Sequence, residues 1–265
     1  MTDSTVLSAV NERGVATVTL NRPDKHNAFD DTIIAALRTT FDGLAARDDV
    51  RLVVLASEGR SFSAGADLAW MKRMAEYDFG HNMKDAEQLA AMLKALWDLP
   101  QPTIARVQGA AFGGAVGLVS CCDMAIGSTR ASFALSEVKI GLIPATISPY
   151  VIRAIGERAA RRLFTTGERI DAASALQMGL LSEVVADDEI DTCVANLADS
   201  ILANGPDAVR AAKNLVNSVS GVPITDALIE DTCARIAHIR VSEEGQEGLQ
   251  AFLNKRPPAW QGKED

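Results

Sequence analysis

The sequence predicts an α/β fold, in which short buried strands alternate with helices. The order strand, loop, helix occurs three times before residue 123, and a unit of this kind lays each strand beside the previous one. After residue 188 the helical spacing of apolar residues continues with hardly a strand signal. We therefore expect a strand-containing core over residues 1–190 and a helical C-terminal region over residues 191–265.

The first unit opens with a predicted β-hairpin, residues 6–10 and 15–20, because apolar and polar side chains alternate on both sides of a short turn. A polar loop, residues 21–27, follows it. Asp30 and Asp31 then precede apolar residues at helical spacing, and acidic side chains favour a helix N-terminus. An amphipathic helix is expected from there to about residue 44.

The second unit begins with a short apolar strand, residues 51–56. A loop of small residues, 57–66, leads into a helix through Trp70 and Met74. Another helix is predicted over residues 84–99, and it ends where two prolines interrupt the pattern.

The third unit contains the longest uncharged run of the chain. A strand is predicted at residues 103–107, followed by a break and then a glycine-rich helix over residues 110–122. Unpaired N–H groups at the first turn of that helix, near Gly113 and Gly114, would point at any ligand in front of them. Such donors can form half of an oxyanion hole, and a pair of glycines can equally serve close packing.

The remainder of the chain is predicted to be mostly helical, with one more short strand at residues 180–185. Helices are expected over residues 144–155, 157–165 and 172–178, the last of them capped by Asp171. Three or four further helices follow residue 188 and are broken by Gly-Pro and Gly-Val-Pro. An all-helical tail of this kind suits docking on a neighbouring subunit, so a homo-oligomer is expected.

Composition excludes several classes of partner. The 265 residues include 26 Lys and Arg against 35 Asp and Glu, a net charge of −9, which disfavours nucleic acid or an anionic membrane surface as the main partner. The first residues lack the basic start and apolar core of a signal peptide, so we expect a cytoplasmic protein. The four cysteines form no CxxC pair or Cys/His cluster, and no metal or other cofactor is implied.

Several motifs together resemble the crotonase family, also called the enoyl-CoA hydratase/isomerase superfamily. They are NRPDKHNAF (21–29), SFSAGADLAWM (61–71), PTIARVQGAAFGGAVGL (102–118), CD (122–123), FALSEVKIGLIP (133–144) and EGLQAFLNKRPP (247–258). The resemblance covers essentially the whole chain. It implies a spiral of ββα units with a helical C-terminal region, assembled as a homotrimer or a dimer of trimers.

The resemblance also implies an acyl-CoA thioester as substrate. The oxyanion donors would be the backbone N–H groups of Ala66 and Gly114, which would hold the thioester carbonyl. Proton transfer at the α carbon passes through an enolate whose charge gathers on that oxygen, so two such donors suit the chemistry. The positions that match CoA contacts in the family are Lys25, Ala28, Ala64, Asp67, Leu68, Phe252 and Lys255, the last two reaching CoA from a neighbouring subunit.

One departure from the family pattern bears on the reaction. Hydratases of the family use two glutamates, and Glu137 matches the one that exchanges a proton at the α carbon. The other position is Gly117, which has no side chain. A single acid/base is the pattern of the family's double-bond isomerases, so isomerisation with Glu137 as the sole acid/base is an alternative.

A second departure favours hydration. The segment LIPATISPYV, residues 142–151, replaces the glycine-rich segment of many hydratases and resembles bacterial methylglutaconyl-CoA hydratases and their relatives that act on isohexenylglutaconyl-CoA. Those enzymes hydrate branched substrates with a second carboxylate, on the routes of leucine and acyclic-terpene breakdown. The expected acyl-pocket residues are Trp70, Met71, Gly117, Ser148 and Tyr150.

Other function classes fit less well. The three histidines lie in no nucleophile–base arrangement and there is no GxSxG elbow, so a hydrolytic triad is not indicated. Lys72 and Arg73 are expected to be solvated helix charges, with the alternative that one of them meets a substrate carboxylate. A non-catalytic or RNA-binding member of the family is the remaining alternative, and the acidic balance disfavours it.

Overall fold

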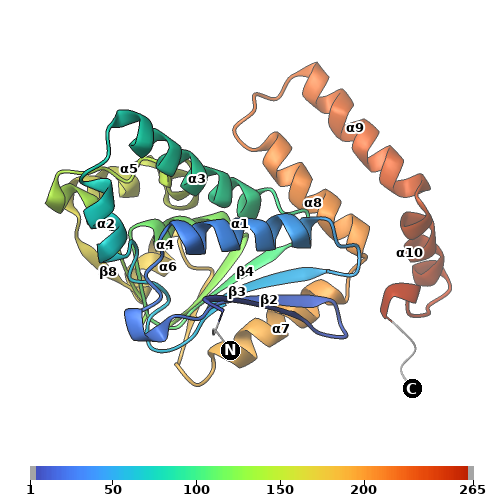
Figure 1. The fold of residues 1–265 in the computed structure, drawn as a ribbon. Coiled ribbons are helices and arrows are strands. Elements are labelled where there is room, and N and C mark those ends of the chain that lie inside the picture. Colours follow the sequence, from blue (N-terminus) through green and yellow to red (C-terminus); the bar gives the residue numbers. More distant parts are fainter. Residues whose placement is uncertain (1–3, 262–265) are drawn as a thin grey trace.

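The computed structural model describes residues 4–261 and contains two sheets, a large one and a small one (Figure 1). The large sheet has the strand order β1 (Val6–Val10), β2 (Val15–Leu20), β3 (Leu52–Ser57), β4 (Thr103–Val107), β6 (Met124–Ser128) and β9 (Glu183–Val185). Its first pair is the predicted antiparallel hairpin, and every later pair is parallel. The small sheet has the order β5 (Ala110–Phe112), β7 (Ser132–Ala134) and β8 (Arg169–Asp171).

Helices connect and cover these strands. They are α1 (Asp31–Ala45), α2 (Leu68–Met74), α3 (Phe79–Trp97), α4 (Gly114–Cys121), α5 (Ser148–Thr166), α6 (Ala172–Met178), α7 (Ile190–Leu202), α8 (Pro206–Val219), α9 (Asp226–Val241) and α10 (Glu243–Leu253). Short 3₁₀ helices lie at Pro23–Lys25, Glu137–Ile140 and Ala259–Gln261. The predicted α/β class with a helical C-terminal region is confirmed.

The central strands of the large sheet are buried on both faces. On one face α1, α3, α4 and α5 pack into the main core around side chains such as Phe41 and Leu55. On the other face α7 packs against Leu52, Val54 and Ile126. Because α7 buries Ile190, Val194 and Ala198 on the sheet, this helix packs with the strands, and the division at residue 190 stays a prediction.

Three predicted helix boundaries were wrong. The glycine-rich helix begins at Gly114, because Ala110–Phe112 pairs with β7 as a strand. The helix expected from residue 84 begins at Phe79, where Asp78 caps it through the N–H of His81. The helix expected from residue 144 begins at Ser148, whereas the predicted break between residues 155 and 157 is present as a kink at Gly156, whose φ is 75°.

The C-terminal helices α8, α9 and α10 form an arm beside the core (Figure 1). Lys213 of α8 fastens the arm at its base, since its ammonium lies 2.7 Å from Asp123 and donates to the carbonyl of Gln101 at 2.9 Å. None of the side chains of α8 or α9 is fully buried. Within residues 4–261, no helix is both long and apolar enough to span a bilayer.

Candidate active site

A cavity of about 590 Å³ opens where α2, α3 and α4 approach the segment of residues 141–147. Ala66, Gly114 and Glu137 all line it. The sequence places these three residues in separate motifs, and the fold brings them to one wall. Most of the remaining lining is apolar, including Phe29 and Leu89, so the cavity suits an acyl chain beside a polar reaction centre.

The loop that carries Ala66 is held from both sides by strand-like pairing. Ser63 bonds to β5 through its N–H to Ala110 and its carbonyl to the N–H of Phe112, both at 3.0 Å. Phe29 donates to the carbonyl of Gly65, and Asp67 donates back to Phe29. In the part of the chain that the structure describes, the N–H of Ala66 donates no hydrogen bond and is available to a ligand oxygen.

The N–H of Gly114 is available in the same way. Gly113, with φ of 54°, donates to the carbonyl of Ala134 at 2.9 Å and turns the chain into α4. The N–H of Gly114 then stands at the first turn of the helix, and within residues 4–261 it donates to no protein acceptor. A side chain is excluded there, because a Cβ on Gly114 would lie 2.6 Å from the ring of Phe29.

Glu137 begins a 3₁₀ turn and projects its carboxyl against this bare backbone. A Cβ on Gly113 would lie 3.2 Å from its Oε1. The other oxygen, Oε2, is buried and takes no hydrogen bond from any residue that the structure describes. Burial raises the pKa of Glu137 above its usual 4.5. An acid with a raised pKa and a free buried oxygen is suited to proton transfer with a ligand.

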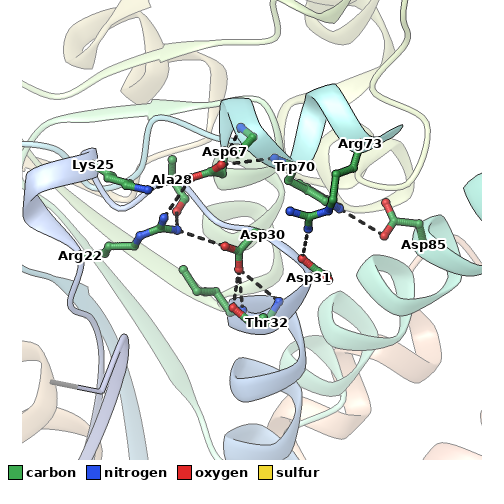
Figure 2. Close-up of polar contacts among 12 residues, drawn as sticks. Arg22, Lys25, Ala28, Asp30, Asp31, Thr32, Asp67, Trp70, Arg73 and Asp85 are labelled. Atoms are coloured by element: carbon green, nitrogen blue, oxygen red, sulfur yellow. Dashed lines mark hydrogen bonds and ion pairs between the residues drawn. The ribbon is translucent and has the colours of Figure 1, made fainter. Parts of the chain in front are cut away.

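A buried polar network positions the loops around this wall (Figure 2). Arg22 donates to Asp67 at 3.0 Å and to Asp30 at 3.2 Å, while the two carboxylates cap α2 and α1. Asn27, with 1% of its surface exposed, donates to the carbonyls of Glu58 and Ser61. These bonds tie the NRPDKHN loop to the Ala66 loop. Sequence reasoning assigned neither Arg22 nor Asn27 a role.

The predicted CoA contacts lie at two ends of the molecule. Lys25 and Ala64 are exposed on the segments beside the cavity, Leu68 is exposed at the first position of α2, and Ala28 is half-buried. Asp67 is buried and already committed, because its N–H bonds to Phe29 and its carboxylate caps α2. A direct contact of Asp67 with CoA stays a prediction.

Phe252 and Lys255 lie at the end of α10, on the opposite side of the molecule from α2 (Figure 1). The side chain of Phe252 is 81% exposed. From this position they do not reach the cavity of their own chain. The expectation that they act on a neighbouring subunit stays a prediction.

The expected acyl-pocket residues are only partly brought together. Trp70 lines the cavity, and Met74 lines it where Met71 was expected. Gly117 lies behind the wall, since a Cβ there would be 2.3 Å from Cγ2 of Ile147. Ser148 donates to the carbonyl of Ala145, and Tyr150 packs against Trp97 with ring centroids 5.5 Å apart and the ring planes tilted by 53°. Neither Ser148 nor Tyr150 is part of the cavity lining, because both belong to α5, which turns them away.

Two polar residues of the cavity escaped sequence analysis. Asn82 and Asp85 project from α3, one turn apart, into the same space as Glu137. The indole N–H of Trp70 donates to Asp85 at 3.3 Å (Figure 2). Burial raises the pKa of Asp85, although the Trp70 hydrogen bond and the charge of Arg73 act in the opposite direction. Their spacing of three residues on a helix was the only available signal.

Comparison with known proteins agrees with this geometry. The sequence matches the family described as enoyl-CoA hydratase/isomerase over residues 10–263. An enoyl-CoA hydratase from Shewanella pealeana is 46% identical, with a TM-score of 0.94 over 97% of this chain and 96% of that chain. One from Mycobacterium smegmatis is 34% identical, with a TM-score of 0.92 over 98% and 100%.

A 2,3-dehydroadipyl-CoA hydratase from Escherichia coli is 31% identical over 95% of this chain and 97% of its own length. The chain therefore belongs to the enoyl-CoA hydratase/isomerase family, the crotonase superfamily that its motifs resemble. Within that family it is an enzyme of the enoyl-CoA hydratase type.

Proposed function

We propose that this enzyme adds water across the double bond of a 2-enoyl-CoA. One observation carries the proposal. Among the residues that the structure describes, a half-buried glutamate whose buried oxygen has no partner shares a cavity with two backbone N–H groups that donate no hydrogen bond. The N–H groups of Ala66 and Gly114 bind the thioester oxygen and stabilise the enolate. Removing one donor of this type typically costs about 3 kcal/mol of transition-state stabilisation. Glu137 exchanges the proton at the α carbon.

The acyl group that we propose is methylglutaconyl, from leucine breakdown, or a related branched glutaconyl group. Its second carboxylate is separated from the β carbon by one methylene, so the groups that hold it lie near the reaction centre. The segment of residues 142–147, which resembles that of the branched-substrate hydratases, lines the cavity and supports this choice.

We also propose that the working form is a trimer or a dimer of trimers. The exposed apolar side chains of the arm support this, among them Ile229 and Ile236 of α9 and Phe252 of α10. In such an assembly the end of α10 reaches the CoA site of a neighbour.

A double-bond isomerase that uses Glu137 alone is the second candidate, and Gly117 favours it. Solvent oxygen enters the product only in hydration, so oxygen-labelled water separates the two reactions. We expect one labelled hydroxyl on methylglutaconyl-CoA, detected by product mass, and little turnover of crotonyl-CoA or of a 3-enoyl-CoA. Rapid conversion of the 3-enoyl-CoA to the 2-enoyl form without label would contradict the hydratase proposal.

A further inference from the structure

Water addition requires a second group besides the one at the α carbon. The added water must be held at the β carbon, and one of its protons must be removed. Glu137 exchanges the proton at the α carbon, and Gly117 has no side chain that could act as a base. A side chain at Gly117 would collide with Ile147 and would meet Leu93 at 3.5 Å, so the structure leaves no room for a missing glutamate. The second group must come from another part of the cavity wall.

The cavity wall offers few candidates. Its polar side chains, among the residues that the structure describes, are Asn82, Asp85, Glu137 and Thr146. The amide hydrogens of Asn82 are committed to the carbonyls of Tyr77 and Asp78, at 3.1 and 3.2 Å. An amide and a hydroxyl are neutral and remove no proton at neutral pH. Asp85 is therefore the second base of the lining.

Asp85 is oriented for such a task. It stands on α3, whose face toward the core is fixed by buried Met92, Leu93 and Leu96. The Trp70 N–H holds Oδ1, and no other hydrogen bond to this carboxylate forms within residues 4–261. Its second oxygen thus remains able to accept from water. A pair of acids in different surroundings is the arrangement that lets one act as acid and the other as base.

We propose that Asp85 is the second carboxylate of the reaction and binds the water that adds to the β carbon. The water oxygen forms its bond to the β carbon while Asp85 takes one of its protons. The electron pair of the double bond moves to the α carbon, which receives the proton of Glu137. Asp85 then returns its proton to Glu137 through solvent, so the net change is the addition of one water. This step rests on the proposed hydratase activity.

Asp85→Asn tests the assignment, because it keeps the shape of the side chain and removes the base. Two rates are measured on the intact enzyme: hydration of methylglutaconyl-CoA, and exchange of the α protons of butyryl-CoA in deuterated water. Exchange needs Glu137 and the oxyanion donors, and it adds no water. We expect hydration to fall about 100-fold or more, within the range for a lost acid/base group, and exchange to change less than about threefold.

The matched control is Glu87→Gln, the same change of charge on an exposed position of the same helix. It is expected to alter neither rate. Unchanged hydration in Asp85→Asn overturns the proposal. A parallel loss of both rates overturns it too, since Asp85 would then only shape the cavity. If the unmodified enzyme exchanges α protons but hydrates none of the enoyl-CoA substrates, the hydratase activity itself fails and this inference fails with it.

Discussion

Glu137 illustrates how a single residue acquires a role from its surroundings. Its carboxyl lies in a largely apolar cavity against the backbone of Gly113, and one of its oxygens has no partner among the described residues. Leaving such an atom unpaired costs stability, commonly 1 to 3 kcal/mol or more for a charged group. Exchange of a proton between this oxygen and the α carbon of a bound ligand relieves the cost, and this is the physical basis for its assignment.

Glu137→Gln should abolish hydration and leave CoA binding nearly intact, because only the proton-exchanging group is lost. The expected loss is about 100-fold or more. In the unmodified enzyme the protonated acid gives its proton to the α carbon, so hydration should decline as pH rises through the pKa of Glu137. Burial places that decline above pH 4.5. The checks are a pH profile of hydration and calorimetric titration with CoA. Activity in the glutamine variant equal to that of the unmodified enzyme would remove Glu137 from the mechanism.

The packing of helix α4 excludes a second glutamate at residue 117. Gly117 is fully enclosed within it, and Ile147 occupies the place that a side chain would need. From the sequence, Gly117 was expected to line the acyl pocket. In the structure, protein fills the space beside it.

Gly117→Glu should therefore destabilise the fold, since overpacking a buried site typically costs about 1 to 3 kcal/mol. Activity should fall with every substrate. The paired change Gly117→Glu with Ile147→Ala removes the collision at Ile147. It should recover stability, and with two glutamates it should gain hydration of crotonyl-CoA. Urea unfolding and the crotonyl-CoA rate measure the two effects. If Gly117→Glu alone is as stable as the unmodified enzyme, the side chains around residue 117 rearrange more easily than the contact distances indicate.

The molecule consists of a core, which contains the cavity, and the arm of helices α8, α9 and α10, which extends away from the cavity. The arm is joined to the core through the Lys213 pair and carries its end away from the cavity (Figure 1). If the end of α10 contacts the CoA site of a neighbouring chain, CoA affinity depends on Lys255, which lies far from the cavity of its own chain.

Lys255→Ala should then raise the Michaelis constant for the CoA thioester more than it lowers turnover, because a lost contact to the carrier weakens ground state and transition state alike. Mixed oligomers of Lys255→Ala and Glu137→Gln chains sharpen the test. Some sites would combine an intact Glu137 with a neighbour's intact Lys255, and activity at low substrate should exceed that of either variant alone. An unchanged Michaelis constant would exclude Lys255 from the CoA site.

The sequence determined the local features of this protein. The hairpin, the caps at Asp30 and Asp171, and the parallel strand–helix order are set by alternation and by residues a few positions apart. The motifs that placed Ala66, Gly114 and Glu137 are equally local. Their backbone conformations depend on small residues and on turns that the sequence displays.

Only the tertiary structure decided what those motifs face. Ala110–Phe112 became a strand because β7 pairs with it, and Tyr150 turned from the cavity because α5 begins at Ser148. Asp85 shows the same limit, since an acid on an amphipathic helix is ordinarily a solvated charge. It enters the cavity because Met92 and Leu93 bury the inner face of α3 while Trp70 holds its carboxylate. Contacts between distant segments, which periodicity does not encode, selected the lining of this site.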